Sequence, residues 1–139
     1  MSIAGTWYNE LGSVMTIQTN GKVITGSYQT AVGNATGLYD LIGQTITAGD
    51  SSEVLGWVVV WDNQYGNSES VTTWSGQIQN VNGIPTIVTT WLLTSETDPN
   101  DDWHSTIIGK DVFTNKQPTS QEIEEKLKKG VKPSFVAKK

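Results

Sequence analysis

The sequence predicts an all-β protein: an eight-stranded antiparallel up-and-down β-barrel with a short C-terminal helical tail. Segments rich in Val, Ile, Thr, Trp and Tyr alternate with short turns of Gly, Asn and Asp, a pattern typical of such barrels. Asn20-Gly21 and Asn82-Gly83 are expected to form tight hairpins, because both residue types tolerate positive φ. Closing eight strands into a barrel removes the exposed sheet edges and leaves room for one small ligand.

Turn residues bound each of the predicted strands. We expect strands at residues 4–10, 13–19, 23–30, 37–48, 54–62, 68–80, 84–95 and 103–113. Because every connection between them is short, consecutive strands are expected to be neighbours in the sheet. Side chains alternate with a period of two, so each strand has one face directed inward.

The fifth and sixth predicted strands form a hairpin with the most informative pattern. Trp57 and Trp61 share one face of its first arm, and Ser70, Thr72 and Trp74 share one face of its second arm. A buried hydroxyl is costly unless it is hydrogen-bonded. Hydroxyls beside indoles on an inward face therefore predict a pocket whose polar groups bind a ligand.

A basic tail follows the predicted barrel. The chain is expected to divide into a barrel domain, residues 1–116, and a tail, residues 117–139. In the tail, Thr119 and Glu122 have the spacing of a capping box, and Gly130 is positioned to end the helix. The helix has few apolar residues, so it is expected to be weakly docked, and disorder is expected beyond Lys132 unless a partner is present.

Charge and composition restrict the classes of partner. The chain carries a net charge of −5 at pH 7 and has no arginine. Seven lysines and three glutamates from residue 116 onward give +4, while two lysines and eleven acids before it give −9. An acidic body without arginine argues against nucleic acid, and the absence of a long apolar run argues against a membrane span. No basic, apolar signal peptide begins the chain, so the sequence itself leaves the localisation open.

No residue pattern of an enzyme or a metal site stands out. His104 is the only histidine and there is no cysteine, which argues against a transition-metal site. A Gly-x-Ser-x-Gly nucleophile motif is absent. Asp98, Asp101 and Asp102 lack the spacing of a calcium-binding loop and are interpreted as a solvated turn. We therefore expect a protein that is not an enzyme and that has no cofactor.

Several motifs occur in order along the predicted barrel. They include Gly5-Thr6-Trp7-Tyr8-Asn9, Thr25-Gly26-Ser27-Tyr28, Leu55-Gly56-Trp57, Thr72-Thr73-Trp74-Ser75-Gly76, Trp91-Leu92-Leu93-Thr94-Ser95 and Gly109-Lys110-Asp111-Val112-Phe113. Together they resemble the avidin family, and within it most closely the streptavidin-like members. The resemblance implies a secreted barrel that sequesters biotin non-covalently and with high affinity at its open end. It also implies self-association, as a homotetramer or alternatively a dimer.

The resemblance assigns roles to individual polar residues. Asn9, Ser13 and Tyr28 correspond to the three donors to the ureido oxygen of biotin. Asp111 and Thr30 correspond to the acceptors of its two N–H groups. Three convergent donors would favour the polarised form of that oxygen, as an oxyanion hole does.

The remaining parts of biotin are assigned, again by resemblance, to aromatic and hydroxyl residues. Trp61, Trp74 and Trp91 correspond to the hydrophobic box around the bicyclic ring, and Leu93 lines the same face. The other implied contacts are Thr72 to the ring sulfur, Ser70 and the backbone of Asn34 to the carboxylate, and Trp103 donated from a neighbouring subunit. Trp7 and Trp57 are expected to fill the core.

Four residues depart from the family pattern. Thr30 stands where streptavidin has serine, and it keeps the hydroxyl. Lys110 stands where histidine is expected and is predicted on the opposite face from Asp111, where symmetry could bring like charges together and weaken assembly. The Asp101-Asp102 pair beside Trp103 adds negative charge near the site mouth, which would slow an anionic ligand.

A second interpretation of the same residues stays open, since a fold alone does not determine function. The barrel could bind a different small ligand or a glycan, or could be an enzyme or inhibitor that holds a sugar or peptide in its Trp-lined groove. That interpretation offers no catalytic pair and leaves Asn9, Ser13, Tyr28 and Asp111 unexplained. Hydrolytic or glycan-binding activity that biotin fails to block would favour it.

Overall fold

The computed structural model describes residues 2–30, 37–48, 52–62 and 69–135. Its strands are β1 (Gly5–Tyr8), β2 (Val14–Asn20), β3 (Val23–Gln29), β4 (Leu38–Ala48), β5 (Ser52–Val60), β6 (Ser70–Val81), β7 (Ile84–Ser95) and β8 (Thr106–Phe113). A 3-10 helix, η1 (Pro99–His104), precedes β8, and one α-helix, α1 (Ser120–Lys128), follows it. The predicted all-β architecture with a short helical tail is confirmed.

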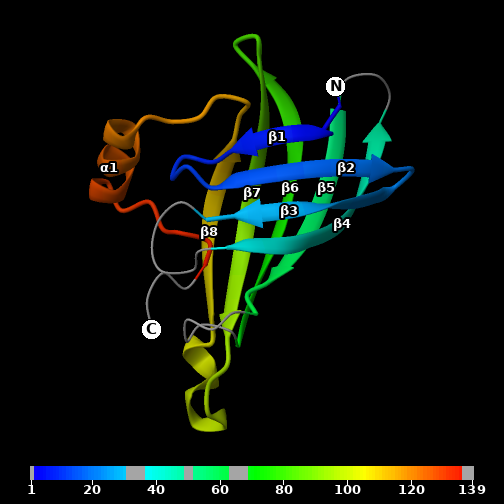
Figure 1. Ribbon diagram of the computed structural model, residues 1–139. Coiled ribbons are helices and arrows are strands. Elements are labelled where there is room, and N and C mark those ends of the chain that lie inside the picture. The colour runs from blue at the N-terminus through cyan, green and yellow to red at the C-terminus, as the bar shows by residue number, and fades with distance from the viewer. Residues whose placement is uncertain (1, 31–36, 49–51, 63–68, 136–139) are drawn as a thin grey trace.

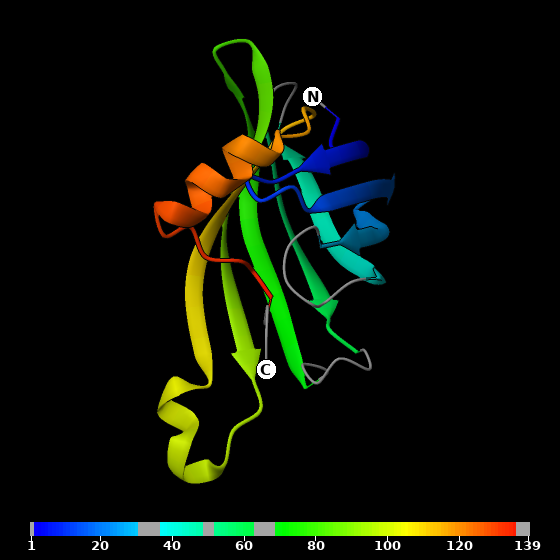
Figure 2. The same cartoon turned by 60° about the vertical axis from the view of Figure 1, so that its left-hand side comes forward.

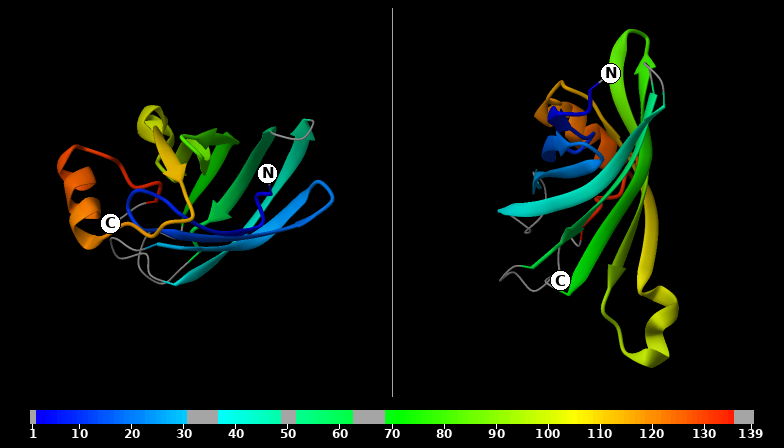
Figure 3. Two further views of the ribbon diagram at one scale, coloured as in Figure 1. Left: turned by 90° about the horizontal axis from the view of Figure 1, so that it is seen from above. Right: turned by 90° about the vertical axis from the view of Figure 1, so that its right-hand side faces the viewer.

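The eight strands form one antiparallel sheet in the order of the sequence. In Figure 1, β1 to β4 run across the view while β5 to β8 run nearly upright, so the sheet curls into a half-barrel. Figure 3 shows the same curl from above, with α1 at its side. Tyr8 and Thr114 exchange two backbone hydrogen bonds of 2.7 and 2.9 Å, which bring the first strand to the end of the last.

The turn chemistry agrees with the sequence, except before β8. Gly21, Asn82 and Gly83 all adopt positive φ, as the two predicted hairpins require. The expected strand start at Trp103 was wrong, because that residue lies in η1. Pro99 sits in the first turn of η1, where its fixed φ favours a helical turn over an extended strand.

Indole packing across neighbouring strands forms the centre of the core. Trp57 and Trp74 are paired in register, and their rings stack at 5.2 Å with an interplanar angle of 15°. Trp91 lies opposite Gly109 on β8, and a Cβ at that glycine would meet the Trp91 indole at 2.1 Å. The glycine therefore makes room for the indole inside the barrel.

The tail leaves the barrel and then returns to it. The Thr119 hydroxyl accepts from the Glu122 N–H at 3.1 Å and the Glu122 carboxylate accepts from the Thr119 N–H at 3.0 Å, which confirms the capping box. No residue of α1 is buried. After Gly130, at φ 86°, the segment shown in red in Figure 2 crosses in front of β7 and ends beside β6.

The end of this segment lies inside the barrel. Ser134 and Phe135 are 1% and 2% exposed. The sequence predicted disorder beyond Lys132 unless a partner is present. In the structure the barrel interior supplies the apolar contacts that the tail itself lacks. The division of the chain after residue 116 stays a prediction.

Candidate ligand-binding site

Polar side chains from distant parts of the sequence meet inside the barrel. Asp111 on β8 is 1% exposed, and Asn9, just after β1, is 3% exposed. The Asn9 amide Nδ2 donates to Asp111 Oδ1 and to the Tyr28 hydroxyl, both at 3.4 Å. The Trp74 indole N–H donates to the other carboxylate oxygen of Asp111 at 2.9 Å. The cluster therefore draws on β3, β6, β8 and the turn after β1.

The turn after β1 sets the orientation of the Asn9 amide. Its oxygen Oδ1 accepts hydrogen bonds from the backbone N–H groups of Leu11 and Ser13, at 3.0 and 2.9 Å. Gly12 in the same turn adopts φ 81°, which favours glycine. Because the turn occupies the amide oxygen, the amide nitrogen is left as the group that donates into the barrel.

Ser13 adds a buried hydroxyl to the same region. Its side chain is fully buried, and its Oγ forms no hydrogen bond of normal length and angle with the residues that the structure describes. It lies close enough to the Tyr28 hydroxyl to lower the pKa of that group. Leaving such a group unpaired costs about 1–3 kcal/mol. A persistent cost of this kind is typical of a binding site, where a ligand supplies the missing partner.

Burial shifts the pKa values of the two titratable side chains in this cluster, Asp111 and Tyr28. Burial raises the pKa of Asp111 to about 7, and hydrogen bonding from the Trp74 indole opposes the shift. Burial also raises the pKa of Tyr28, and the nearby Asp111 carboxylate adds to the effect. Tyr28 therefore keeps its proton at neutral pH and can donate it, whereas Asp111 changes charge near neutrality.

Aromatic rings form a wall beside the polar cluster. The Tyr28 ring lies 5.1 Å from the Trp74 ring and 5.7 Å from the Trp61 ring, centroid to centroid. The Trp61 indole N–H donates to the Thr72 hydroxyl at 2.8 Å. Trp91 on β7 is fully buried. The arrangement combines flat apolar surfaces with a few placed polar groups, as small-molecule sites do.

The structure buries most of the predicted site residues together. Buried are Asn9, Ser13, Tyr28, Thr30, Trp61, Ser70, Thr72, Trp74, Trp91, Leu93 and Asp111. Trp103 lies apart from them, 79% exposed in η1, with its ring 4.7 Å from that of His104. Asn34 lies outside the described residues.

Sequence reasoning missed two residues that touch this site. The Phe135 ring lies 5.8 Å from the Trp61 ring, and the Ser134 carbonyl accepts a hydrogen bond from the Thr72 hydroxyl. The Ser134 hydroxyl lies 3.4 Å from the Tyr28 hydroxyl. One signal could have found them, because Phe135 is the only aromatic residue after Phe113.

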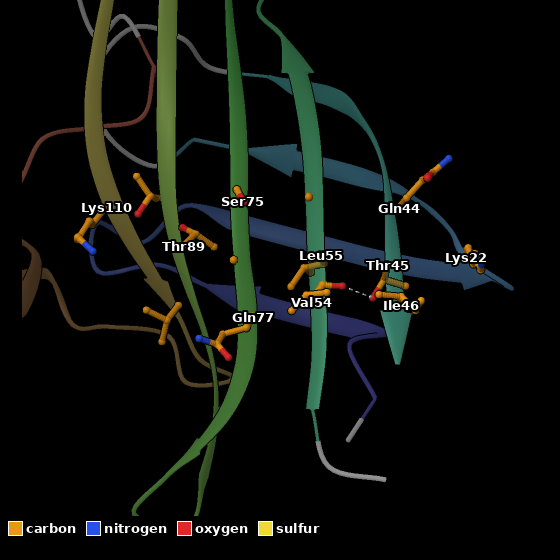
Figure 4. Close-up of a pocket in the computed structure, with 14 residues that line it drawn as sticks. Lys22, Gln44, Thr45, Ile46, Val54, Leu55, Ser75, Gln77, Thr89 and Lys110 are labelled. Carbon is orange, nitrogen blue, oxygen red and sulfur yellow. Dashed lines mark hydrogen bonds between the residues drawn. The ribbon is translucent and has the colours of Figure 1, made fainter. Parts of the chain in front are cut away.

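Among the hollows formed by the described residues, two are alternatives to the barrel interior. A cavity of about 290 Å³ at the barrel mouth is lined by Leu93 and Ile107 together with Pro133 and Phe135 of the tail. A larger hollow of about 820 Å³ lies on the outer face, where Figure 4 shows side chains such as Gln44, Gln77 and Lys110. Those three side chains are exposed, whereas the buried, partly unpaired polar groups lie inside the barrel. The interior is therefore the candidate site.

Two further observations concern the described residues alone. They contain no group of three or more His, Cys, Asp or Glu side chains arranged to hold a metal ion. None of their helices has the length and apolar character needed to cross a membrane.

Comparison with known proteins agrees with this geometry. The model of the avidin family matches residues 1–116. The chain belongs to the avidin family. Avidin from Gallus gallus is 37% identical over 122 residues, which cover 81% of this chain and 77% of that protein. Afifavidin from Afifella pfennigii is 32% identical over 120 residues, covering 81% of this chain and 69% of that protein.

A third avidin-family relative is similar to the same extent. Avidin-related protein 4/5 from Gallus gallus is 38% identical over 122 residues, covering 81% of this chain and 77% of that protein. These similarities establish the family, and the expected closeness to its streptavidin-like members stays a prediction. The aromatic cluster of Trp61, Trp74 and Trp91 fits the tryptophan box expected of an avidin-family barrel.

Proposed function

We propose that this protein binds biotin non-covalently and with high affinity inside the barrel, and so sequesters it. The observation that carries the proposal is the buried cluster of Asn9, Tyr28 and Asp111, with the buried, poorly paired hydroxyl of Ser13 beside it. Membership of the avidin family supports it. A ureido ring offers one strong acceptor oxygen and two N–H donors, which is the complement of this cluster.

The two ends of the cluster are proposed to act together on the ureido group. Asn9, Ser13 and Tyr28 donate to its oxygen, while Asp111 and Thr30 accept from its N–H groups. Donors that draw charge toward the oxygen make the N–H groups more acidic, so the Asp111 carboxylate binds them more strongly. The raised pKa of Tyr28 keeps its donor proton in place.

The aromatic wall is proposed to hold the apolar part of biotin. Trp61, Trp74, Trp91 and Leu93 would pack against the bicyclic ring and chain, and burial of that surface supplies non-directional affinity. Thr72 is assigned to the ring sulfur. Ser70 and Asn34 are assigned to the carboxylate. No bond forms or breaks in this scheme, so the protein acts as a binder and not as an enzyme.

Self-association completes the proposal, as a homotetramer or alternatively a dimer. Aliphatic side chains are exposed on the outer face of the sheet, among them Ile42 (57%), Val60 (57%) and Ile108 (62%). A band of this kind is typical of a subunit interface. The exposed Trp103 is proposed to reach into a neighbouring subunit's site. Secretion, which the family resemblance implies, belongs to the same proposal.

A tryptophan-fluorescence titration with biotin tests the function. We expect saturation at one biotin per chain, and about tenfold to hundredfold weaker binding in Ser13→Ala, because a buried polar group of the ligand loses a partner. Ser120→Ala is the matched control, since Ser120 is exposed on α1. Absence of a fluorescence change, together with no retention on immobilised biotin after long incubation, would refute the proposal. Glycan binding that biotin leaves unchanged would favour the alternative ligand.

A further inference from the structure

The turn after β1 contacts the strand that carries Asp111 at two consecutive residues. The Asn9 amide Nδ2 donates to Asp111 Oδ1 at 3.4 Å. The backbone N–H of Val112, the next residue of β8, donates to the carboxylate of Glu10, the next residue of the turn. Asn9 belongs to the proposed biotin site, and Glu10 lies one residue outside it. The turn therefore holds both the side chain of Asp111 and the backbone that follows it.

The Glu10 carboxylate takes the place of a strand partner for β8. Tyr8 and Thr114 exchange backbone hydrogen bonds, and among the described residues this is the only backbone pairing between the first and the last strand. Backbone N–H groups alternate sides along a strand, so the N–H of Val112 points to the same side as that of Thr114. Because β1 ends at Tyr8, it provides no carbonyl opposite Val112. The Glu10 carboxylate accepts the N–H that a longer β1 would have paired.

The opposite side of β8 is held by β7. Thr89 is 2% exposed and lies directly opposite Asp111 in the register. Its hydroxyl donates to the backbone carbonyl of Asp111 at 2.9 Å. Contacts on both sides of β8 restrict the backbone at Asp111, whose carboxylate meets Asn9 and Trp74 inside the barrel. A carboxylate held in this way binds a ligand without the entropic cost of ordering it first.

Glu10 also brings a second carboxylate close to Asp111. Burial raises the pKa of Asp111, and the negative charge of Glu10 raises it further. Burial raises the pKa of Tyr28 on β3, and the charges of both carboxylates add to that shift. Burial raises the pKa of Glu10 itself, which the Val112 N–H and the charge of Lys126 on α1 oppose. Figures 1 and 2 show α1 beside the turn after β1, so a lysine of the helix acts on this pair of acids.

We propose that Glu10 is a positioning residue of the biotin site, which fixes the Asp111 strand through the Val112 N–H and sets by its charge the lower pH limit of biotin binding. The proposal rests on the proposed function, because it acts through the contact of Asp111 with a ureido N–H. A carboxylate accepts such an N–H more strongly than a carboxylic acid does. A second negative charge beside Asp111 disfavours its carboxylate form, so Asp111 takes up a proton and releases biotin at a higher pH than it would alone.

The expected pH dependence follows from the Asp111 pKa of about 7. At pH 8 about nine in ten copies carry the Asp111 carboxylate, and at pH 6 about one in ten. Biotin affinity is therefore expected to fall by about tenfold from pH 8 to pH 6. Without the charge of Glu10, the midpoint of this profile is expected to move down by about half a unit to one unit, which makes binding at pH 6 about threefold to fivefold tighter.

Two substitutions separate the hydrogen bond of Glu10 from its charge. Glu10→Gln keeps an acceptor oxygen for the Val112 N–H and removes the charge, whereas Glu10→Ala removes both. Biotin affinity is measured at pH 6, 7 and 8 from association and dissociation rates followed by tryptophan fluorescence. Glu10→Gln is expected to match the wild type at pH 8 and to bind about threefold to fivefold more tightly at pH 6. Glu10→Ala is expected to bind about threefold to tenfold more weakly at pH 8, because the Val112 N–H loses its acceptor.

Asp40→Asn is the matched control, because it removes one negative charge from an exposed position on β4 and should keep the wild-type profile. The NMR resonance of the Asp111 carboxyl carbon, identified by its loss in Asp111→Asn and titrated without biotin, reports the coupling independently of the ligand. A lower midpoint in Glu10→Gln than in the wild type would support the proposal. If Glu10→Ala does not fold, the comparison of Glu10→Gln with the wild type decides the question.

Three outcomes would count against these assignments. Equal midpoints in Glu10→Gln and the wild type, with equal biotin affinities at pH 6, would overturn the proposal while leaving biotin binding intact. An equal loss of affinity in both Glu10 variants at every pH would overturn it as well, because an acceptor at this place would then not suffice. A shifted midpoint in a protein that does not bind biotin would overturn the proposed function and leave only the coupling of Glu10 to Asp111.

Discussion

Asp111→Asn should change how the stability of the fold depends on pH. Asp111 is 1% exposed, and burial raises its pKa from 3.8 to about 7. The folded state therefore holds a proton between about pH 4 and 7 that the unfolded state has released. The free energy of unfolding contributed by this group falls as the pH rises through that window, and it is constant above it.

The magnitude follows from the shift. One proton contributes a slope of at most about 1.4 kcal/mol per pH unit, which sums to about 4 kcal/mol over the window. Asparagine has the same shape, keeps an oxygen for the Trp74 indole and does not titrate. The stability of the wild type relative to Asp111→Asn is therefore expected to fall from pH 5 to pH 7 and to level off by pH 8.

Urea unfolding followed by tryptophan fluorescence, at pH 5, 6, 7 and 8 without biotin, measures this difference. Asp40→Asn is the control, because Asp40 is exposed on β4 and its replacement should leave the pH dependence of the wild type unchanged. A constant difference between the wild type and Asp111→Asn across this range would refute the argument from burial. A difference that rises with pH would show that Asp111 is stabilised as a carboxylate by partners stronger than those seen here.

Two further predictions concern packing and assembly. Gly109→Ala should destabilise the fold by about 1–3 kcal/mol, because the added Cβ meets the buried Trp91 indole at 2.1 Å. Thermal melting measures this change. The control Gly56→Ala should lose less stability, because the nearest atom to its added Cβ is a backbone oxygen at 3.2 Å. Trp103→Lys should keep the circular dichroism spectrum, because that side chain is 79% exposed, but should speed biotin release and weaken assembly. Unaltered assembly by light scattering together with unaltered release would contradict the shared-site proposal.

The barrel could be predicted from the sequence because its determinants are local. Asn82-Gly83 adopts the positive φ of a hairpin turn, and the alternation along β5 and β6 places Trp57 and Trp74 on the buried face. The capping box at Thr119 and Glu122 also depends only on neighbouring residues. Trp103 was misplaced in a strand because its β-propensity did not outweigh the helical turn that Pro99 begins.

The site was only partly predictable, because its members come from distant strands. Periodicity indicates that Asp111 faces inward, yet it does not show that the Trp74 indole binds one carboxylate oxygen and Asn9 the other. The docking of Phe135 depends on contacts with Trp61, more than seventy positions earlier in the chain. The single aromatic residue of the lysine-rich tail marks Phe135 as a candidate for docking, but no local pattern identifies the residue that it contacts.

The tail contacts matter for anyone who uses this protein as a tool. The two ends of the described chain lie at opposite ends of the barrel. In a meander, β1 begins at the end that carries the β2–β3, β4–β5 and β6–β7 turns. Phe135 packs at the other end, near the last residues of β5. Because Phe135 packs near the mouth, a fusion partner or surface linker on the C-terminal side of it would compete with a ligand for space there. Attachment through the N-terminus leaves the mouth clear, so the end chosen for coupling decides whether an immobilised sample reports the binding site or the linker.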